Sequence, residues 1–211
     1  MSPRTLFTFP MPLPPPRLVT DRLILRTARG KDVPSILRFV AEERGPMGRF
    51  FPRRPPAQFT AAHWRRNVKA MEEERRAGRS VVFYLFHRRR PGTVIGRVAL
   101  SAIVRGAMHG CFLGYALASR HQGKGLMTEA LRGILPYAFG PLGLHRVGAN
   151  YIPSNARSAR VLRRLGFHRE GLAPAYLLID GKWRDHVLTA LVNPEWRPPE
   201  GPAGGGRATP R

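Results

Sequence analysis

The sequence predicts a single α+β domain, with a central, mostly antiparallel sheet of seven strands and about four helices around it. Short runs rich in β-branched and aromatic residues alternate with helical patterns, and turn sequences separate several consecutive strands. The length of 211 residues and the 43% of hydrophobic residues suit one globular domain. The elements are expected in the order β-α-α-β-β-β-α-β-α-β-β.

The first third of the chain predicts one strand and two helices. Residues 18–26 alternate apolar and charged side chains, which indicates a strand. A helix is expected to open at Asp32, a good N-cap residue, because Pro34 suits its first turn. After a proline-rich loop, a second amphipathic helix is predicted over 59–76, and Gly78 ends it.

The middle of the chain predicts three strands joined by turns. The strands cover residues 81–86, 94–104 and 111–118. Turns are expected at 90–92 and 106–110, where glycine stands beside proline or other small residues. The third of these strands leads into a glycine-containing loop and then into a helix.

The last third predicts a strand, a helix and a closing hairpin. The strand covers 146–151, and the helix covers 156–165. An Asp-Gly pair at 180–181 is a strong signal for a two-residue hairpin turn between strands at 167–179 and 183–191.

The two ends of the chain differ in composition from its centre. We expect a proline-rich extended arm over 1–16, the folded domain over 17–196, and a disordered tail rich in glycine and proline over 197–211. The arm holds no apolar run of signal-peptide length, and no stretch approaches the roughly 20 apolar residues that span a membrane. A cytoplasmic protein without a membrane partner is therefore expected.

Charge and cysteine content restrict the function classes. The formal net charge is +23, mostly from arginine, and such a field attracts polyanions such as ribosomal RNA. The arginines are scattered, as on an ordinary solvated surface, and nothing indicates sequence-specific reading of a nucleic acid. Cys111 is the only cysteine, which excludes an internal disulfide and argues against a Cys-based metal site. We predict no metal, and a buried, inert thiol.

Six residues, from Arg120 to Gly125, join a predicted strand to a predicted helix. This arrangement presents backbone N–H groups to an anion, and the helix dipole adds positive charge. Gly123 leaves the backbone open and permits a positive φ, as does Gly125. The P-loop pattern fails at Leu126, and the dinucleotide pattern fails at Thr128. Taken alone, the loop suits a pyrophosphate-bearing cofactor or a plain glycine turn.

A second segment starts another predicted helix thirty residues later. Asn155 and Ser158 share a face there, although Asn155 also suits an N-cap and Ser158 a local hydrogen bond. Leu-Gly-Phe at 165–167 closes the helix. Together, the R-x-x-G-x-G loop and this N-x-x-S…L-G-F segment resemble the GCN5-related N-acetyltransferase family, in its RimJ/RimL-like branch. The likeness covers residues 18 to about 196.

The resemblance implies that acetyl-CoA is the cosubstrate and lies where two neighbouring strands splay apart, near Tyr115–Ala118. Leu117 would hold the pantetheine arm, and backbone N–H groups between Gln122 and Leu126 would hold the pyrophosphate. Arginines of the predicted helix at 156–165, namely Arg157, Arg160 and Arg164, would reach the 3′-phosphate. The expected cofactor-binding residues are Leu117, Arg120, Gln122, Gly123, Lys124, Gly125, Leu126, Asn155 and Arg160.

The resemblance also implies that a neutral α-amine attacks the thioester directly, without an acyl-enzyme. Ser158 would stabilise or protonate the leaving thiolate, and Asn155 would hydrogen-bond the cofactor arm or order a water. Related enzymes place a glutamate base where Leu177 stands here. The base is therefore open among Asp185, His186, Glu129 and a water chain. The candidate catalytic residues are Ser158, Asn155 and Asp185.

Three functions are compatible with this site. The first is acetylation of the N-terminal alanine of a small-subunit ribosomal protein, as the resemblance implies. The second is acetylation of a small amine, such as a polyamine or an aminoglycoside, although the many arginines of residues 33–76 argue against a cationic acceptor. The third is a ribosome-assembly or RNA-binding factor that keeps the fold.

Overall fold

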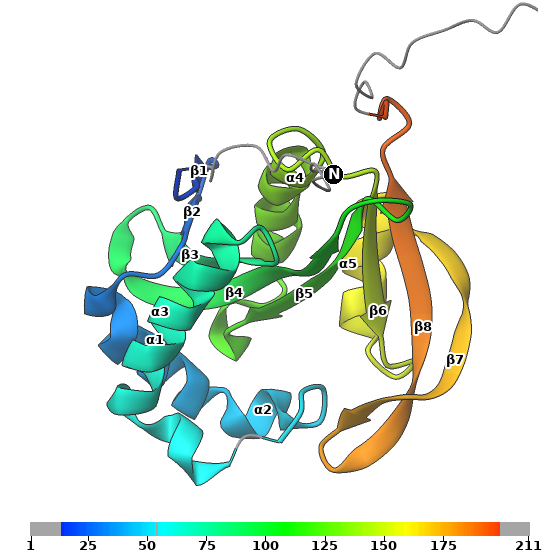
Figure 1. The fold of residues 1–211 in the computed structure, drawn as a ribbon. Helices are drawn as coiled ribbons and strands as arrows, with labels where there is room; N and C mark the ends of the chain where they lie inside the picture. Colours follow the sequence, from blue (N-terminus) through cyan, green and yellow to red (C-terminus); the bar gives the residue numbers. More distant parts are fainter. Residues whose placement is uncertain (1–13, 54, 199–211) are drawn as a thin grey trace, which may run out of the picture.

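An eight-stranded mixed sheet runs through the molecule (Figure 1). The computed structural model describes residues 14–53 and 55–198. The strand order is β1-β2-β3-β4-β5-β6-β8-β7, and every pair is antiparallel except β5 with β6. The strands are β1 Arg17–Val19, β2 Leu23–Arg26, β3 Val81–His87, β4 Arg90–Val104, β5 Gly110–Leu117, β6 Arg146–Tyr151, β7 His168–Ile179 and β8 Lys182–Val192.

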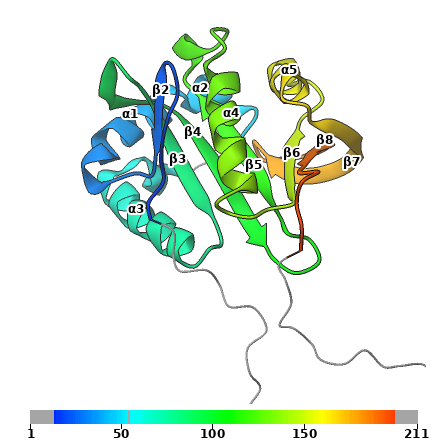
Figure 2. The ribbon, with the colours of Figure 1, turned by 90° about the horizontal axis from the view of Figure 1, so that it is seen from above.

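Helices cover both faces of this sheet (Figures 1 and 2). α1 and α3 pack on one face, over Tyr84 and Phe86, while α4 packs on the other, over Phe83 and Leu25. α5 lies on the same face as α4 and contacts α4 and β6. The predicted α+β class with a mostly antiparallel sheet is confirmed. The helices are α1 Val33–Glu42, α2 Arg44–Gly48, α3 Ala61–Arg76, α4 Leu126–Phe139 and α5 Ala156–Arg164, with 3-10 turns at Gly30–Asp32, Pro56–Phe59 and Ser119–His121.

The single strand predicted over 18–26 is wrong, since the chain forms two strands there. β1 and β2 pair antiparallel, with Leu18 opposite Leu25. The chain reverses at Thr20, whose N–H donates to the Leu23 carbonyl and whose hydroxyl accepts from the Leu23 N–H. The sheet therefore has eight strands and not seven. The predicted alternation is confirmed, because Leu23 and Leu25 are fully buried.

The turn predicted at 90–92 is also misplaced. The chain turns at residues 88–89, and β4 already begins at Arg90. The extra residues are absorbed by an irregular pairing, in which His87 faces Arg90 but Phe86 faces Val94. A β-bulge of this kind accommodates glycine and proline without ending the strand.

Asp32 precedes α1, but its side chain does not cap that helix. Its carboxylate accepts from the Arg26 guanidinium at 2.6 and 2.8 Å and from the Arg29 N–H at 2.7 Å. Burial raises the pKa of Asp32, but these hydrogen bonds outweigh burial and lower the pKa below its ordinary value. α2 lies inside a predicted loop, so five α-helices occur among the described residues instead of four.

The predicted splay between neighbouring strands is confirmed. β5 and β6 pair only over Gly110–Phe112 and Arg146–Gly148, and they share no ladder beyond these residues. The second half of β5 therefore borders an opening in the sheet. β5 leads into the loop before α4, and β6 leads towards α5, so both predicted site segments begin at the same opening.

The chain ends lie largely beyond the described residues. The predicted arm over 1–16 falls outside them except for residues 14–16, which have no regular structure before β1. The tail predicted over 197–211 likewise falls outside them from residue 199 onward. The predicted Asp-Gly hairpin turn is described and confirmed, since Asp180 and Gly181 both adopt positive φ angles, of 48° and 74°.

Candidate active site

The loop after β5 holds backbone N–H groups without partners beside the start of α4. Gly123 and Gly125 have φ angles of 76° and 74°, in the left-handed region that favours glycine. A Cβ at Gly123 would meet no atom within 4 Å, so its backbone faces open space. Among the described residues, no hydrogen bond uses the N–H of Gly123, Lys124 or Gly125. With the first turn of α4 they form an anion site.

Arg22 and Glu129 fix this loop from behind. The Arg22 guanidinium donates to the Lys124 carbonyl at 3.0 Å and pairs with Glu129 at 2.6 Å. Glu129 also accepts from the Thr20 hydroxyl at 2.6 Å and from the Arg22 N–H at 2.8 Å. Burial raises the pKa of Glu129, but the hydrogen bonds outweigh burial and lower the pKa below its ordinary value. Glu129, one of the alternative bases, is therefore ionised and holds the loop in place through Arg22.

Gln122 joins the loop to both segments that border the opening. Its amide donates to the Leu117 carbonyl at 2.8 Å and accepts from the Arg157 guanidinium of α5 at 2.7 Å. Its backbone N–H donates to the Ser119 carbonyl at 3.2 Å. Of the N–H groups expected to face the pyrophosphate, the one of Gln122 is thus already used.

Positive charge gathers around the loop. Arg120 pairs with Glu42, the last residue of α1, at 2.5 Å, and the Lys124 ammonium donates to the Arg120 carbonyl at 3.1 Å. The pKa of His121 is lowered, first by burial and then by the charges of Arg120 and Lys124. The imidazole is therefore held neutral. The positive charges of Arg120 and Lys124 beside it would favour the binding of an anion.

The two predicted catalytic residues of α5 lie at the start of that helix. Asn155 is the N-cap residue, and its side-chain carbonyl accepts from the Ser158 N–H at 3.1 Å. The Ser158 hydroxyl lies 2.7 Å from the Tyr115 hydroxyl of β5, and either oxygen can donate. This contact crosses the opening between β5 and β6. The prediction of an N-cap at Asn155 is confirmed.

Tyr115 is a residue that the sequence reasoning did not select. Burial, as the largest cause, raises the pKa of Tyr115 to about 12, so its hydroxyl stays protonated at neutral pH. Strand periodicity could have found it: Cys111, Leu113, Tyr115 and Leu117 alternate onto the face that packs against α4. Cys111 is fully buried, and burial raises the pKa of its thiol to about 12, in accord with the predicted inert role.

The remaining base candidates belong to the β7–β8 hairpin. Asp185 accepts from the Ala175 N–H at 2.8 Å, where the pairing of β7 with β8 is irregular. His186 is buried, and its Nδ1 lies 2.9 Å from the Arg184 carbonyl. Leu177, at the position of the expected glutamate, is exposed. The structure gives Asp185 a local structural contact, and its catalytic role stays a prediction. So does the cofactor role of Arg160, an exposed residue of α5.

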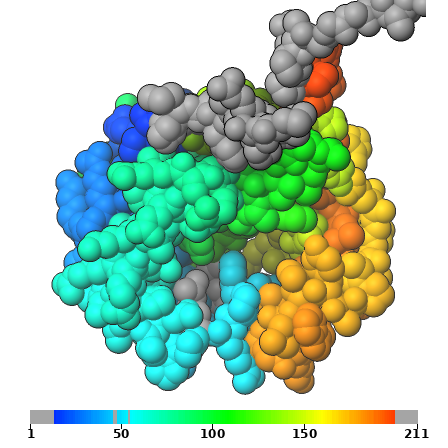
Figure 3. All heavy atoms as spheres, in the orientation of Figure 1, coloured from blue at the N-terminus to red at the C-terminus, as the bar shows by residue number. Residues whose placement is uncertain are grey.

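A cavity of about 380 Å³ opens on the α1 side of the sheet, next to the splayed end of β5. Figure 3 shows this face hollowed between the segment near residue 50 and the β7–β8 hairpin. Arg53 and Asp180 pair across its rim at 2.8 Å, and the Asp180 N–H donates to the Phe51 carbonyl at 3.2 Å. Ala116, which follows Tyr115 on β5, lines the cavity.

Glu43 is a second residue that sequence reasoning did not select. It lines this cavity and is buried, and its carboxylate accepts from the Ser119 N–H at 3.0 Å and the Ser119 hydroxyl at 2.6 Å. A carboxylate oxygen has two lone pairs, so Glu43 keeps capacity for a further proton or donor. The sequence around Glu43 contains no motif that indicates a functional residue. Only the fold places the end of α1 beside Ser119, which follows β5.

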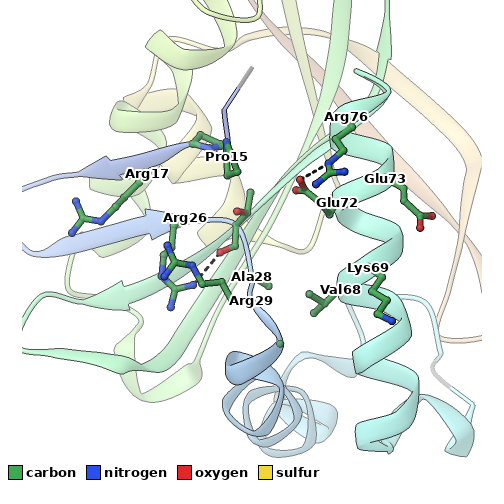
Figure 4. A pocket seen from close by; sticks show the side chains of 13 residues that line it. Pro15, Arg17, Arg26, Ala28, Arg29, Val68, Lys69, Glu72, Glu73 and Arg76 are labelled. Carbon is green, nitrogen blue, oxygen red and sulfur yellow. Dashed lines mark hydrogen bonds and ion pairs between the residues drawn. The ribbon is translucent and has the colours of Figure 1, made fainter. Parts of the chain in front are cut away.

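A larger cavity, of about 480 Å³, lies between the chain entering β1 and the helix α3 (Figure 4). Two of its charged residues pair with each other, since Arg76 lies 2.9 Å from Glu72. The hydrogen bond from Arg75 is the first cause that lowers the pKa of Glu72, to about 2. No lining residue comes from β5, the glycine loop or α5, so this cavity is separate from the candidate site.

The described residues contain no group of three or more His, Cys, Asp or Glu side chains placed to hold a metal ion. In the same part of the chain, no helix has the length and apolar character needed to cross a membrane.

The fold and the anion loop define the class of this protein. A family model for the acetyltransferase (GNAT) domain matches residues 22–168. The chain belongs to this family of acetyltransferases.

Particular relatives lie within that family. The chain is 40% identical over 193 residues to the [ribosomal protein uS5]-alanine N-acetyltransferase of Escherichia coli K12, covering 92% of this chain and 99% of the relative. The structure of the ribosomal-protein-S5-alanine acetyltransferase from Vibrio fischeri superposes with a TM-score of 0.82 at 33% identity, over 86% of this chain and 99% of that one. Mycobacterium smegmatis RimJ, in complex with CoA-disulfide, gives 0.77 at 28% identity, over 86% and 88%.

Proposed function

We propose that this protein transfers the acetyl group of acetyl-CoA to the N-terminal alanine of ribosomal protein uS5. The observation that carries the proposal is the 40% identity to the Escherichia coli enzyme of that specificity, along 99% of its length. The candidate site supports it, because the anion loop and the Ser158–Tyr115 pair flank one opening in the sheet.

Acetyl-CoA fits the residues that are present. The free N–H groups of Gly123, Lys124 and Gly125 would hold the pyrophosphate, together with the first turn of α4. Leu117 would border the pantetheine arm, although its carbonyl already accepts from the Gln122 amide. Asn155 would hold the arm in place from the N-cap position. Arg160 would reach the 3′-phosphate from the exposed face of α5.

The proposed reaction is a direct attack by the amine. The neutral amine nitrogen bonds to the thioester carbonyl carbon, the carbon–sulfur bond breaks, the amine gives up a proton, and coenzyme A leaves as a thiolate. Tyr115 would donate to the Ser158 oxygen, which leaves the Ser158 hydrogen free for the sulfur. In this arrangement Ser158 stabilises the thiolate and Tyr115 positions Ser158.

The cavity on the α1 side would receive the acceptor. We propose Glu43 as the group that takes the proton of the amine, in preference to Asp185, because Glu43 lines the cavity and Asp185 does not. The sequence-based candidate Asp185 would then support the hairpin at the cavity rim through Ala175.

A ribosomal substrate would also account for the surplus of positive charge on this protein. Exposed arginines along α5 would attract ribosomal RNA around the substrate, and such attraction is independent of base sequence. The reaction would then take place in the cytoplasm.

Binding of acetyl-CoA tests the first step of this proposal. A cofactor present at 100 times its Kd should stabilise the folded protein by about 2.7 kcal/mol, since it binds the folded state alone. For a chain of this size the melting temperature should rise by about 5–10 °C in a thermal-shift measurement. Dephospho-CoA should give a smaller rise if Arg160 contacts the 3′-phosphate. An unchanged melting temperature at saturating acetyl-CoA would contradict the proposed function.

A further inference from the structure

Arg97 places a cation in the floor of the acceptor cavity. It lies in the middle of β4, directly between Tyr84 of β3 and Ala116 of β5. All three residues line the cavity. The next residue, Val98, is fully buried against the α4 side of the sheet, as strand alternation requires. The sheet itself therefore holds the Arg97 side chain towards the cavity.

The guanidinium of Arg97 has no partner among the described residues. Its Nε is buried without a hydrogen bond, and no ion pair of the described chain includes Arg97. The other cavity cations are engaged, because Arg53 pairs with Asp180 at 2.8 Å and Arg44 lies over the Phe59 ring at 4.9 Å. A buried donor without a partner costs free energy, and a ligand oxygen would recover it.

The cavity carboxylates do not neutralise this cation. Asp180 is paired with Arg53, and Glu43 accepts from Ser119. The cavity thus contains three arginines and two carboxylates, and the unpaired charge is positive. A guanidinium presents its N–H donors in a planar fork that suits carbonyl and carboxylate oxygens, and it repels a second cation.

We propose that Arg97 binds an oxygen of the acceptor peptide near its N-terminus and thereby selects peptides over polyamines. This inference rests on the proposed function, because it assumes that the cavity receives the acceptor. The oxygen belongs to a backbone carbonyl or to an acidic side chain of the peptide. A polyamine has neither, and its additional ammonium groups meet the unpaired guanidinium at close range.

The test compares wild type with Arg97→Met and Arg97→Lys. Methionine keeps the apolar stem and removes the charge, and removing a buried donor without a partner should leave the melting temperature unchanged or higher. For an alanine-initiated uS5 peptide, KM should rise about tenfold in Arg97→Met, since one hydrogen bond to a charged group is lost. The Kd of acetyl-CoA should stay unchanged. Lysine, which keeps the charge without the fork, should give a smaller rise.

Two peptides identify the oxygen that Arg97 binds. One carries alanine followed by neutral residues only, and the other carries a glutamate near the N-terminus. An equal rise in KM for both assigns the contact to a backbone carbonyl, whereas a rise confined to the acidic peptide assigns it to the carboxylate. Arg90→Met is the matched control, because Arg90 is an exposed arginine on the same strand outside the cavity, and its KM should equal that of wild type.

Activity on spermidine distinguishes the role of Arg97 from the proposed function. The preference for peptide over spermidine, as a ratio of kcat/KM, should fall about tenfold in Arg97→Met. If wild type acetylates the peptide and this ratio and the peptide KM both stay the same in the variant, the role of Arg97 is refuted and the proposed function stands. If wild type binds acetyl-CoA and acetylates no peptide, the proposed function fails, and the role of Arg97 fails with it.

Discussion

Replacement of Gly123 by valine should weaken acetyl-CoA binding at least about 100-fold. The φ angle of 76° is in the left-handed region, which costs an L-residue about 1–2 kcal/mol and a β-branched residue more. The loop would relieve this strain by turning its N–H groups away from the pyrophosphate, and each lost bond to a charged group is worth about 1.5–3 kcal/mol. The loss of two such bonds, about 3–6 kcal/mol, exceeds the roughly 2.8 kcal/mol that corresponds to a 100-fold change.

Gly106 offers a matched control for this measurement. It has a φ angle of 71°, lies in the turn between β4 and β5, and also has no atom within 4 Å of an added Cβ. Gly106→Val should therefore lower the melting temperature by a similar amount and leave the Kd of acetyl-CoA unchanged. Calorimetric titration of both variants separates strain from binding. An unchanged Kd in Gly123→Val would remove the loop from the cofactor site.

Replacement of Tyr115 by phenylalanine should lower kcat about 10- to 100-fold and leave the Kd of acetyl-CoA within a factor of three. Phenylalanine keeps the ring that packs against α4 and removes the hydroxyl that contacts Ser158. The lost contribution, about 1.4–2.8 kcal/mol, lies at or below the roughly 100-fold lower end of general acid catalysis, as suits a residue that positions the donor. Single-turnover kinetics with saturating acetyl-CoA and peptide measure this step.

The double variant distinguishes positioning from independent action. If Tyr115 acts through the Ser158 hydroxyl, then Ser158→Ala and Tyr115→Phe together should be no slower than Ser158→Ala alone. Because burial raises the pKa of Tyr115 to about 12, the wild-type rate should show no loss from tyrosine ionisation between pH 7 and about pH 10. Additive losses in the double variant, or an unchanged kcat in Tyr115→Phe, would contradict the proposed relay.

Much of the fold was predictable because its signals are local. Short runs rich in β-branched and aromatic residues placed β3, β5 and β6, and the Asp-Gly pair placed the last hairpin with its positive φ angles. The glycine loop was predictable for the same reason, since a strand, two glycines and a helix start are adjacent in the chain. The errors at Thr20 and at residues 90–92 occurred where a side-chain hydrogen bond or a bulge decided the local path.

The rest of the site depends on contacts between distant segments. Thr20 and Arg22 contact Glu129, which is more than 100 residues away in the sequence. These contacts give Glu129, an alternative base by sequence, a structural role in holding the loop. Tyr115 meets Ser158 only because β5 and β6 separate after Phe112. Glu43 and Arg97 reach one cavity from α1 and β4. The periodicity of side chains along one strand or helix does not show which distant segments come into contact. These partners therefore had to be identified from the structure.

The identity of the acetylated product tests the proposed function most directly. Small ribosomal subunits with an unmodified uS5 N-terminus are incubated with the enzyme and labelled acetyl-CoA, beside spermidine and an aminoglycoside as competing acceptors. We expect the label on the α-amine of the uS5 N-terminal alanine, with one acetyl group added to that protein by mass spectrometry. Label that accumulates on the small amines, or on other subunit proteins while uS5 stays unmodified, would contradict the account.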